Sequence, residues 1–178
     1  MLGRARLRLA AVLLVAVALL AACGEEEELD VEEGEPVELG DLRYNVQLTR
    51  ILNPNDPEDE AYLRGQPDAR PDQEYLGVFM TVDNEGDETT ELPDEMAIRD
   101  TRDNTYEPVE SDSEFALELG APVPAGDEVP APDTPAASGP ISGAMVLFLV
   151  ERAVTENRPI ELEIPSQTGA EGRVELDI

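Results

Sequence analysis

A strict alternation of apolar and polar residues is the feature of this chain that most narrows its fold. The alternation recurs at residues 42–49, 160–164 and 174–178, and two further strand-length stretches, residues 75–83 and 144–150, are apolar along most of their length. The alternation is typical of β-strands, because successive side chains of a strand point to opposite faces. No stretch shows helical periodicity over more than a turn or two, and Ala116 to Leu119 is the candidate for a short helix. The pattern predicts an all-β chain.

The two apolar stretches carry large apolar residues on both faces, which predicts a central strand at residues 75–83 and a strand covered on both faces at residues 144–150. In residues 75–83, leucine, valine and methionine occupy one face, while Tyr75 and Phe79 occupy the other. Residues 141–150 are the most apolar segment after the leader, yet ten residues are too few to span a bilayer. After residues 42–49, Ile51 and Leu52 break the alternation, which predicts a bulge or the end of the strand.

About seven to nine short strands with proline- and glycine-rich connections predict an antiparallel β-sandwich. Further short strands are expected near residues 89–92, 96–99 and 105–109, the last two joined by a hairpin loop at residues 100–104. Long loops are expected at residues 53–73, with four prolines, and 120–140, with six. The second loop reads as an extended connector. Recognition by a proline-binding partner is the alternative.

The N-terminus has the plan of a secretory signal. Three arginines precede the apolar run from Leu9 to Leu20, and the sequence Ala21-Ala22-Cys23-Gly24 follows, with the only cysteine of the chain. The apolar run, about 14 residues even when extended to Ala22, is too short to cross a bilayer comfortably. An ordinary signal peptide whose cysteine falls there by chance is the alternative.

This junction resembles the lipobox of bacterial lipoproteins. The resemblance implies that residues 1–22 are a signal peptide removed by cleavage, that the Cys23 sulfur carries diacylglycerol, and that its amine in many bacteria carries a palmitate-type acyl group. Two or more acyl chains hold a protein stably on a membrane. The expected location is the extracytoplasmic face of the cell membrane, with membrane lipid as the first partner.

Residues 23–36 are expected to form a lipidated cysteine and an acidic, disordered tether, with the domain spanning residues 37–178. A segment this acidic has few apolar residues to bury, and its charges favour extension. Fully extended, it could lift the domain on the order of 40 Å. An acidic ion-binding arm is the alternative.

Strong acidity excludes nucleic acid as a partner. Without residues 1–22, the chain has nine arginines, no lysine and no histidine against 41 acidic residues, a side-chain charge of −32. Such a surface repels nucleic acid and anionic lipid headgroups. Genome composition, a saline habitat, cation binding and a basic partner are all compatible with it.

The composition also argues against an enzyme. Without histidine or lysine, and with Cys23 expected to be acylated, the chain lacks residues for a histidine-based triad, a Schiff base or a soft-metal site. We therefore assign no catalytic residue, no metal ligand and no cofactor. Paired carboxylates could serve a glycosidase, but the chain has no tryptophan and few other aromatic residues to bind a sugar.

Two hypotheses of function remain. The first is a non-catalytic binding or assembly module with an unknown protein or cell-envelope partner. The second is a low-affinity calcium site, because Asp56 to Glu60 and the loop with Asp100, Asp103 and Asn104 concentrate oxygen ligands. Neither loop has the spacing of an EF-hand, so solvated turns are the alternative.

The order of elements resembles a family of uncharacterised immunoglobulin-like domains common in Gram-positive lipoproteins, grouped with a secreted mycobacterial immunoprotective antigen. The resemblance lies in four segments, Leu39 to Tyr44, Tyr75 to Asn84, Ile98 to Tyr106 and Gly143 to Phe148. It implies an immunoglobulin-like β-sandwich. The chain departs from the family in its longer 53–73 loop and in residues 137–140, where Ala-Ser-Gly-Pro replaces the usual Pro-Gly-Glu. It also lacks the Cys…Trp…Cys core of antibody domains.

Overall fold

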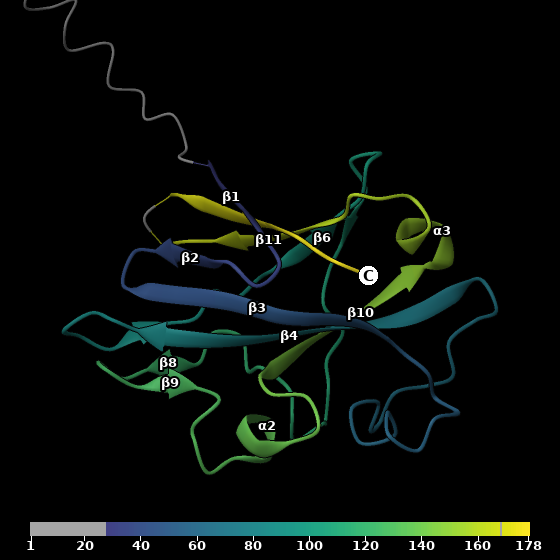
Figure 1. The fold of residues 1–178 in the computed structure, drawn as a ribbon, viewed down its shortest axis with the longest axis horizontal. Coiled ribbons are helices and arrows are strands. Elements are labelled where there is room, and N and C mark those ends of the chain that lie inside the picture. Colours follow the sequence, from purple (N-terminus) through teal and green to yellow (C-terminus); the bar gives the residue numbers. More distant parts are fainter. Residues whose placement is uncertain (1–27, 168) are drawn as a thin grey trace, which may run out of the picture.

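The computed structural model describes residues 28–167 and 169–178. The expected signal peptide, Cys23 and the first tether residues lie outside this range. The described chain forms twelve strands and two four-residue helices, α2 (Pro135–Ser138) and α3 (Arg152–Thr155) (Figure 1). None of the helices in this part of the chain has the length and hydrophobicity that a membrane crossing needs.

Two sheets form the body of the fold. Sheet I has the antiparallel order β10-β4-β3-β2, with β9 also paired to β4. Its strands are β2 (Pro36–Leu39), β3 (Leu42–Leu52), β4 (Gln73–Asn84), β9 (Glu128–Val129) and β10 (Ala144–Glu151). Sheet II has the order β1-β12-β11-β6-β7. Its strands are β1 (Glu28–Glu32), β6 (Ala97–Arg99), β7 (Thr105–Tyr106), β11 (Glu161–Pro165) and β12 (Glu171–Glu175). A small separate ladder joins β5 (Thr90–Glu91) to β8 (Pro122–Val123).

The predicted fold class, an immunoglobulin-like β-sandwich, is confirmed. Four of the twelve strands have only two residues, which leaves eight longer strands, within the predicted range. The main core lies between the sheets. Alternate residues of β4, among them Val78 and Met80, face Ile98, Leu162 and Val174 of sheet II across it, and all are buried. Burial of each such side chain contributes about 1.5–3 kcal/mol, so packing between the sheets is the main stabilising force.

A second core covers the outer face of sheet I. Tyr75 and Phe79 of β4 and Met145 and Leu147 of β10 point to this face. The loop at residues 53–72, Phe115 and the segment from α2 to Ile141 fold over them, burying Tyr62, Leu63, Phe115, Ala136 and Ile141 (Figure 1). The Tyr62 ring meets Phe79 edge-on at 5.2 Å between ring centroids. The prediction that β4 and β10 are covered on both faces is therefore confirmed.

The long loops are only partly as predicted. Residues 53–72 consist of turns, as expected, and β4 begins at Gln73. Residues 120–140 are not a plain extended connector, because β8, β9 and α2 lie within them. The short helix expected at Ala116 to Leu119 is wrong, since Ala116 instead forms a parallel bridge to Met145 of β10. Pairing with the free edge of β10, the end strand of sheet I, satisfies the backbone better than an isolated helical turn.

The irregularity of β3 lies earlier than the sequence suggests. The register with β4 shifts between Val46 and Leu48, so that the two sides of the strand exchange faces there. As a result Leu48 is 37% exposed and Thr49 is buried, although alternation predicts the reverse. Beyond the bulge the strand continues to Leu52, which packs into the second core.

The tether prediction is wrong for residues 28–32. These residues form β1, which pairs in parallel with β12 from Glu28 opposite Glu171 to Glu32 opposite Glu175. Leu29 and Val31 pack against the main core, while Asp30 lies opposite Arg173. The segment is acidic overall, but Leu29 and Val31 alternate with its acidic residues and supply the apolar side of a strand. Their burial and the hydrogen bonds along β12 offset the repulsion among the carboxylates.

Candidate functional site

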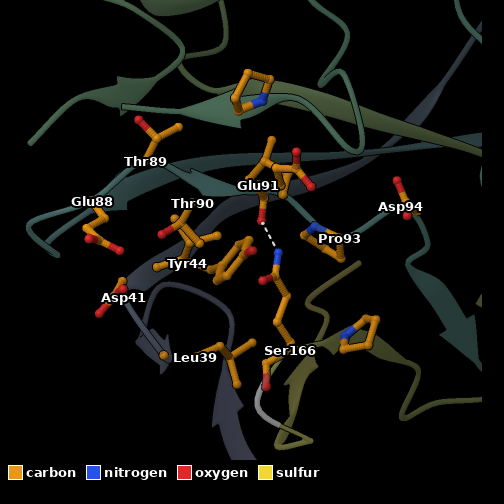
Figure 2. Close-up of a pocket in the computed structure, with 16 residues that line it drawn as sticks. Leu39, Asp41, Tyr44, Glu88, Thr89, Thr90, Glu91, Pro93, Asp94 and Ser166 are labelled. Carbon is orange, nitrogen blue, oxygen red and sulfur yellow. Dashed lines mark hydrogen bonds between the residues drawn. The ribbon is translucent and has the colours of Figure 1, made fainter. Parts of the chain in front are cut away.

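A cavity of about 650 Å³ opens at the end of the sandwich where β2 turns into β3. Three segments far apart in sequence form its walls, namely residues 39–44, residues 88–94 around β5, and residues 165–167 after β11, with Pro122 of β8 beside them. We call it the acidic cavity. Figure 2 shows Tyr44 in the middle of the lining side chains, with Asp41, Glu88 and Asp94 around it.

Tyr44 reaches the cavity from the inward face of β3. Its side chain is 2% exposed, as are Tyr62 and Tyr75 in the second core. The hydroxyl of Tyr75 donates to the carbonyl of Pro67, and that of Tyr62 accepts from the amide of Ile141. The Tyr44 hydroxyl has no hydrogen-bond partner among the described residues. Burial raises the pKa of Tyr44, so its hydroxyl stays neutral and can both donate and accept.

Four exposed carboxylates surround this hydroxyl. The acidic cavity is lined by Asp41, Glu88, Glu91 and Asp94, and its lining contains no arginine. Within the part of the chain that the structure describes, none of the four carboxylates forms an ion pair. Unpaired charges of one sign around a concave surface concentrate the electrostatic potential there. The cavity therefore favours a cation.

Buried hydrogen bonds hold the walls in place. The side-chain amide of Asn84, which is 2% exposed, donates to the carbonyls of both Glu88 and Val123 at 2.8 Å. The Asn84 side-chain oxygen accepts from the amide of Gly86 at 3.0 Å. Across the cavity, Gln167 Nε2 donates to the carbonyl of Glu91 at 3.3 Å, the bond drawn in Figure 2. This bond joins the turn after β11 to β5, so the cavity is built into the fold.

The loop at Asp56 to Glu60, expected to attract calcium, uses its carboxylates for its own structure. Asp59 is buried, pairs with Arg50 at 2.7 Å through Oδ1, and accepts the amide of Asn53 at 2.8 Å through Oδ2. Asp56 Oδ1 accepts the amide of Glu58 at 3.0 Å. These oxygens fold the loop rather than converge on a shared ion position.

In the second acidic loop, the buried carboxylate also accepts hydrogen bonds from its own loop. Asp100, buried at the end of β6, accepts the amides of Arg102 at 2.8 Å and Asn104 at 3.0 Å, and the Asn104 side-chain amide at 2.8 Å. Burial alone raises the pKa of Asp100, but these hydrogen bonds and nearby Arg102 outweigh it and lower the pKa. Asp103 has a positive φ in this hairpin loop. Among the described residues, no group of three potential ligands is arranged to hold a metal ion.

Sequence reasoning missed the acidic cavity. It placed Tyr44 correctly on the buried face of its strand but gave no sign that the hydroxyl is left without a partner. Three of the four acids lie in turns or bends beside strands, and Glu91 lies in the two-residue strand β5. Only the placement of residues 39–44 beside residues 88–94 brings them together.

No family model matches the chain, and neither does any curated protein sequence. Solved structures share its fold. The secreted protein MPT63 of Mycobacterium tuberculosis matches with a TM-score of 0.55 and 12% identity over 85% of this chain and 99% of its own. An uncharacterised β-sandwich protein of Clostridium difficile matches with a TM-score of 0.53 and 11% identity, over 86% and 97% of the two chains.

A candidate lipoprotein of Bacillus subtilis, YcdA, matches with a TM-score of 0.51 and 13% identity. The match covers 83% of this chain but 39% of that protein. At such low identity these likenesses define the fold alone, and the class they define is a β-sandwich domain.

Proposed function

We propose that this chain is an extracytoplasmic lipoprotein, anchored to the membrane by acyl chains on Cys23, whose β-sandwich is a non-catalytic binding module. The leader and the single cysteine at its end support the anchor. Two of the proteins with the same fold are named as a secreted protein and as a candidate lipoprotein, which agrees with a location outside the cytoplasm.

The observation that carries the binding function is the acidic cavity. It combines a tyrosine that is 2% exposed and whose hydroxyl lacks a protein partner with four unpaired carboxylates, in a volume of the size that small-molecule sites have. Because the chain contains no histidine and no lysine, the cavity has no imidazole or amine to move protons near neutral pH. Binding without chemistry is the function that such a lining supports.

The start of β1 limits how far the domain can stand from an anchored Cys23. Glu28 follows Cys23 by five residues, and five extended residues reach at most about 17 Å, well short of the 40 Å expected for the full tether. Across sheet II, Glu28 lies opposite Glu171, which lies opposite Pro165. Since Pro165 lines the acidic cavity, the cavity belongs to the end of the sandwich where the anchor would attach.

Mass spectrometry and phase partitioning test the anchor. The intact protein isolated from membranes should begin at Cys23 and carry the mass of a diacylglycerol group, with or without an additional acyl group. In detergent phase separation it should enter the detergent phase. The Cys23→Ser variant should stay in the aqueous phase, whereas Ser138→Ala, an exposed change in α2, should behave as the unchanged protein. A mature chain starting at an unmodified Cys23 would refute the anchor.

A further inference from the structure

We propose that the acidic cavity binds a small organic cation, with an ammonium group held by the carboxylates at the rim and a polar group hydrogen-bonded to Tyr44. This inference rests on the proposed binding function and names the class of ligand, but it does not depend on the anchor at Cys23. Three properties of the cavity lead to it.

The first property is the state of the Tyr44 hydroxyl. Of three tyrosines that are each 2% exposed, Tyr44 is the one without a hydrogen-bond partner among the described residues, and its side chain lines the cavity. The hydroxyl oxygen is not among the fully buried polar atoms that lack a partner, so it meets the cavity rather than the closed protein interior. The hydroxyl is therefore suited to a ligand that enters the cavity.

The second property is the charge of the lining. Asp41, Glu88, Glu91 and Asp94 supply four negative charges, and no arginine lines the cavity or pairs with them. An anionic ligand would be repelled, while a cation would be attracted from a distance. A bare metal ion fits poorly, because among the described residues no three acidic side chains converge closely enough to coordinate one. Dispersed carboxylates suit a larger cation.

The third property is the mixed character of the walls. Leu39, Leu42 and Leu92 are buried beneath the carboxylates, and Pro93 stands beside them. Apolar groups next to carboxylates favour a cation with a hydrocarbon part over a strongly hydrated inorganic ion. The volume of about 650 Å³ accommodates an organic molecule of moderate size.

Such an ammonium group could come from a free amine or from the headgroup of a lipid. The cavity lies at the end of sheet II where β1 begins, which is the end nearest an anchored Cys23. Both sources present the same chemistry to Tyr44 and the carboxylates. Spermidine and choline serve as probes of the first source, and glycerophosphoethanolamine serves as a soluble probe of the second.

The test is calorimetric titration of the mature protein with each probe, at low and at physiological ionic strength. We expect saturable binding of at least one probe with one site per chain, weakened by salt because rim carboxylates contribute. Tyr44→Phe, which removes only the hydroxyl, should weaken binding about tenfold. Glu91→Gln combined with Asp94→Asn should weaken it and reduce its salt dependence. The matched controls Tyr106→Phe and Glu60→Gln, both outside the cavity, should change neither.

Thermal unfolding of each variant checks that it folds. Should Tyr44→Phe fail to fold, the double variant at the exposed rim decides by itself, since Glu91 and Asp94 are not part of the core. Absence of saturable binding by every cationic probe, or equal binding by the rim variant, overturns the proposal. A parallel thermal-shift screen with anions and neutral sugars distinguishes failure of the cation proposal from failure of the binding function itself. A hit there that Tyr44→Phe removes keeps the binding function and rejects the cation, whereas no hit in any class rejects both.

Discussion

The guanidinium of Arg50 on β3 lies 2.7 Å from the carboxylate of Asp59, which is 1% exposed. The same carboxylate accepts the amide of Asn53, and the Asp59 carbonyl accepts the amides of Tyr62 and Leu63. This one residue therefore ties a 20-residue loop to the sheet and sets Tyr62 over Phe79. An acidic residue that composition alone would place on the surface organises the second core.

Replacing Arg50 should lower the free energy of unfolding more than replacing Asp59. Arg50→Ala leaves the Asp59 charge buried without a counter-charge, so we expect a loss of about 3 kcal/mol in the free energy of unfolding. Asp59→Asn keeps an acceptor for Asn53 and leaves Arg50, which is 34% exposed, free to reach water, so the loss should be about 1–2 kcal/mol. Urea denaturation measures both. A larger loss for Asp59→Asn would contradict this account of the pair.

Strand β1 should contribute to stability through Leu29 and Val31. Replacing both by serine removes apolar surface from the edge of the main core, and we expect a loss of about 2 kcal/mol. The matched control, Asp30→Ser with Glu32→Ser, changes two exposed residues of the same strand and should stay within about 0.5 kcal/mol. Equal effects of the two pairs, measured by urea denaturation, would mean that residues 28–32 act as a tether after all.

Gly143 should tolerate no side chain. Its φ is +117°, and a Cβ there would lie 2.9 Å from the backbone nitrogen and 3.0 Å from the carbonyl oxygen of Met80. Since neither backbone can move without breaking the β4–β10 ladder, we expect Gly143→Ala to cost about 3 kcal/mol or more. Gly126 also has a positive φ, but a Cβ added there would have no atom within 4 Å. Gly126→Ala should therefore cost about 1 kcal/mol. Comparable thermal midpoints for the two variants would refute the steric argument.

The Asp100 loop should lose stability in acid. Because the pKa of Asp100 in the folded chain is below its ordinary value of 3.8, ionisation stabilises the fold. The contribution is complete above about pH 5 and is lost as the pH falls through 3.8 towards the folded pKa. The difference in urea midpoint between the unchanged protein and Asp100→Asn should therefore shrink between pH 6 and pH 3. Asp103→Asn, an exposed change in the same loop, serves as control. A difference that stays constant over this range would exclude Asp100 as the group responsible.

Local periodicity was sufficient to predict the strands that build the sandwich. The alternation in residues 42–46 and 160–164 corresponds to β3 and β11, and the apolar stretches at residues 75–83 and 144–150 correspond to β4 and β10. Side-chain direction in a strand depends on position alone, so these local patterns suffice. Prediction failed where a partner strand decides the conformation. Residues 28–32 became β1 only because the edge of β12 was open to pair with them, and acidic composition gives no sign of that edge.

The site was harder to predict than the fold. Tyr44 is one of many apolar or aromatic residues on buried faces, and Asp41, Glu88, Glu91 and Asp94 are among 41 acidic residues. Nothing in their spacing separates them from the rest. What distinguishes Tyr44 is the lack of a hydrogen-bond partner, which depends on every neighbour around it.

The sequence by itself determined the all-β class and the burial of β4 and β10 on both faces, and it predicts an export leader over residues 1–22, because these follow from local patterns of hydrophobicity. The tertiary structure alone decided that β1 belongs to the sandwich and that Asp59 is buried with Arg50. It also decided that four unpaired carboxylates meet around Tyr44. Each of these depends on segments brought together from distant positions in the chain, and only long-range packing determines which groups find partners and which do not.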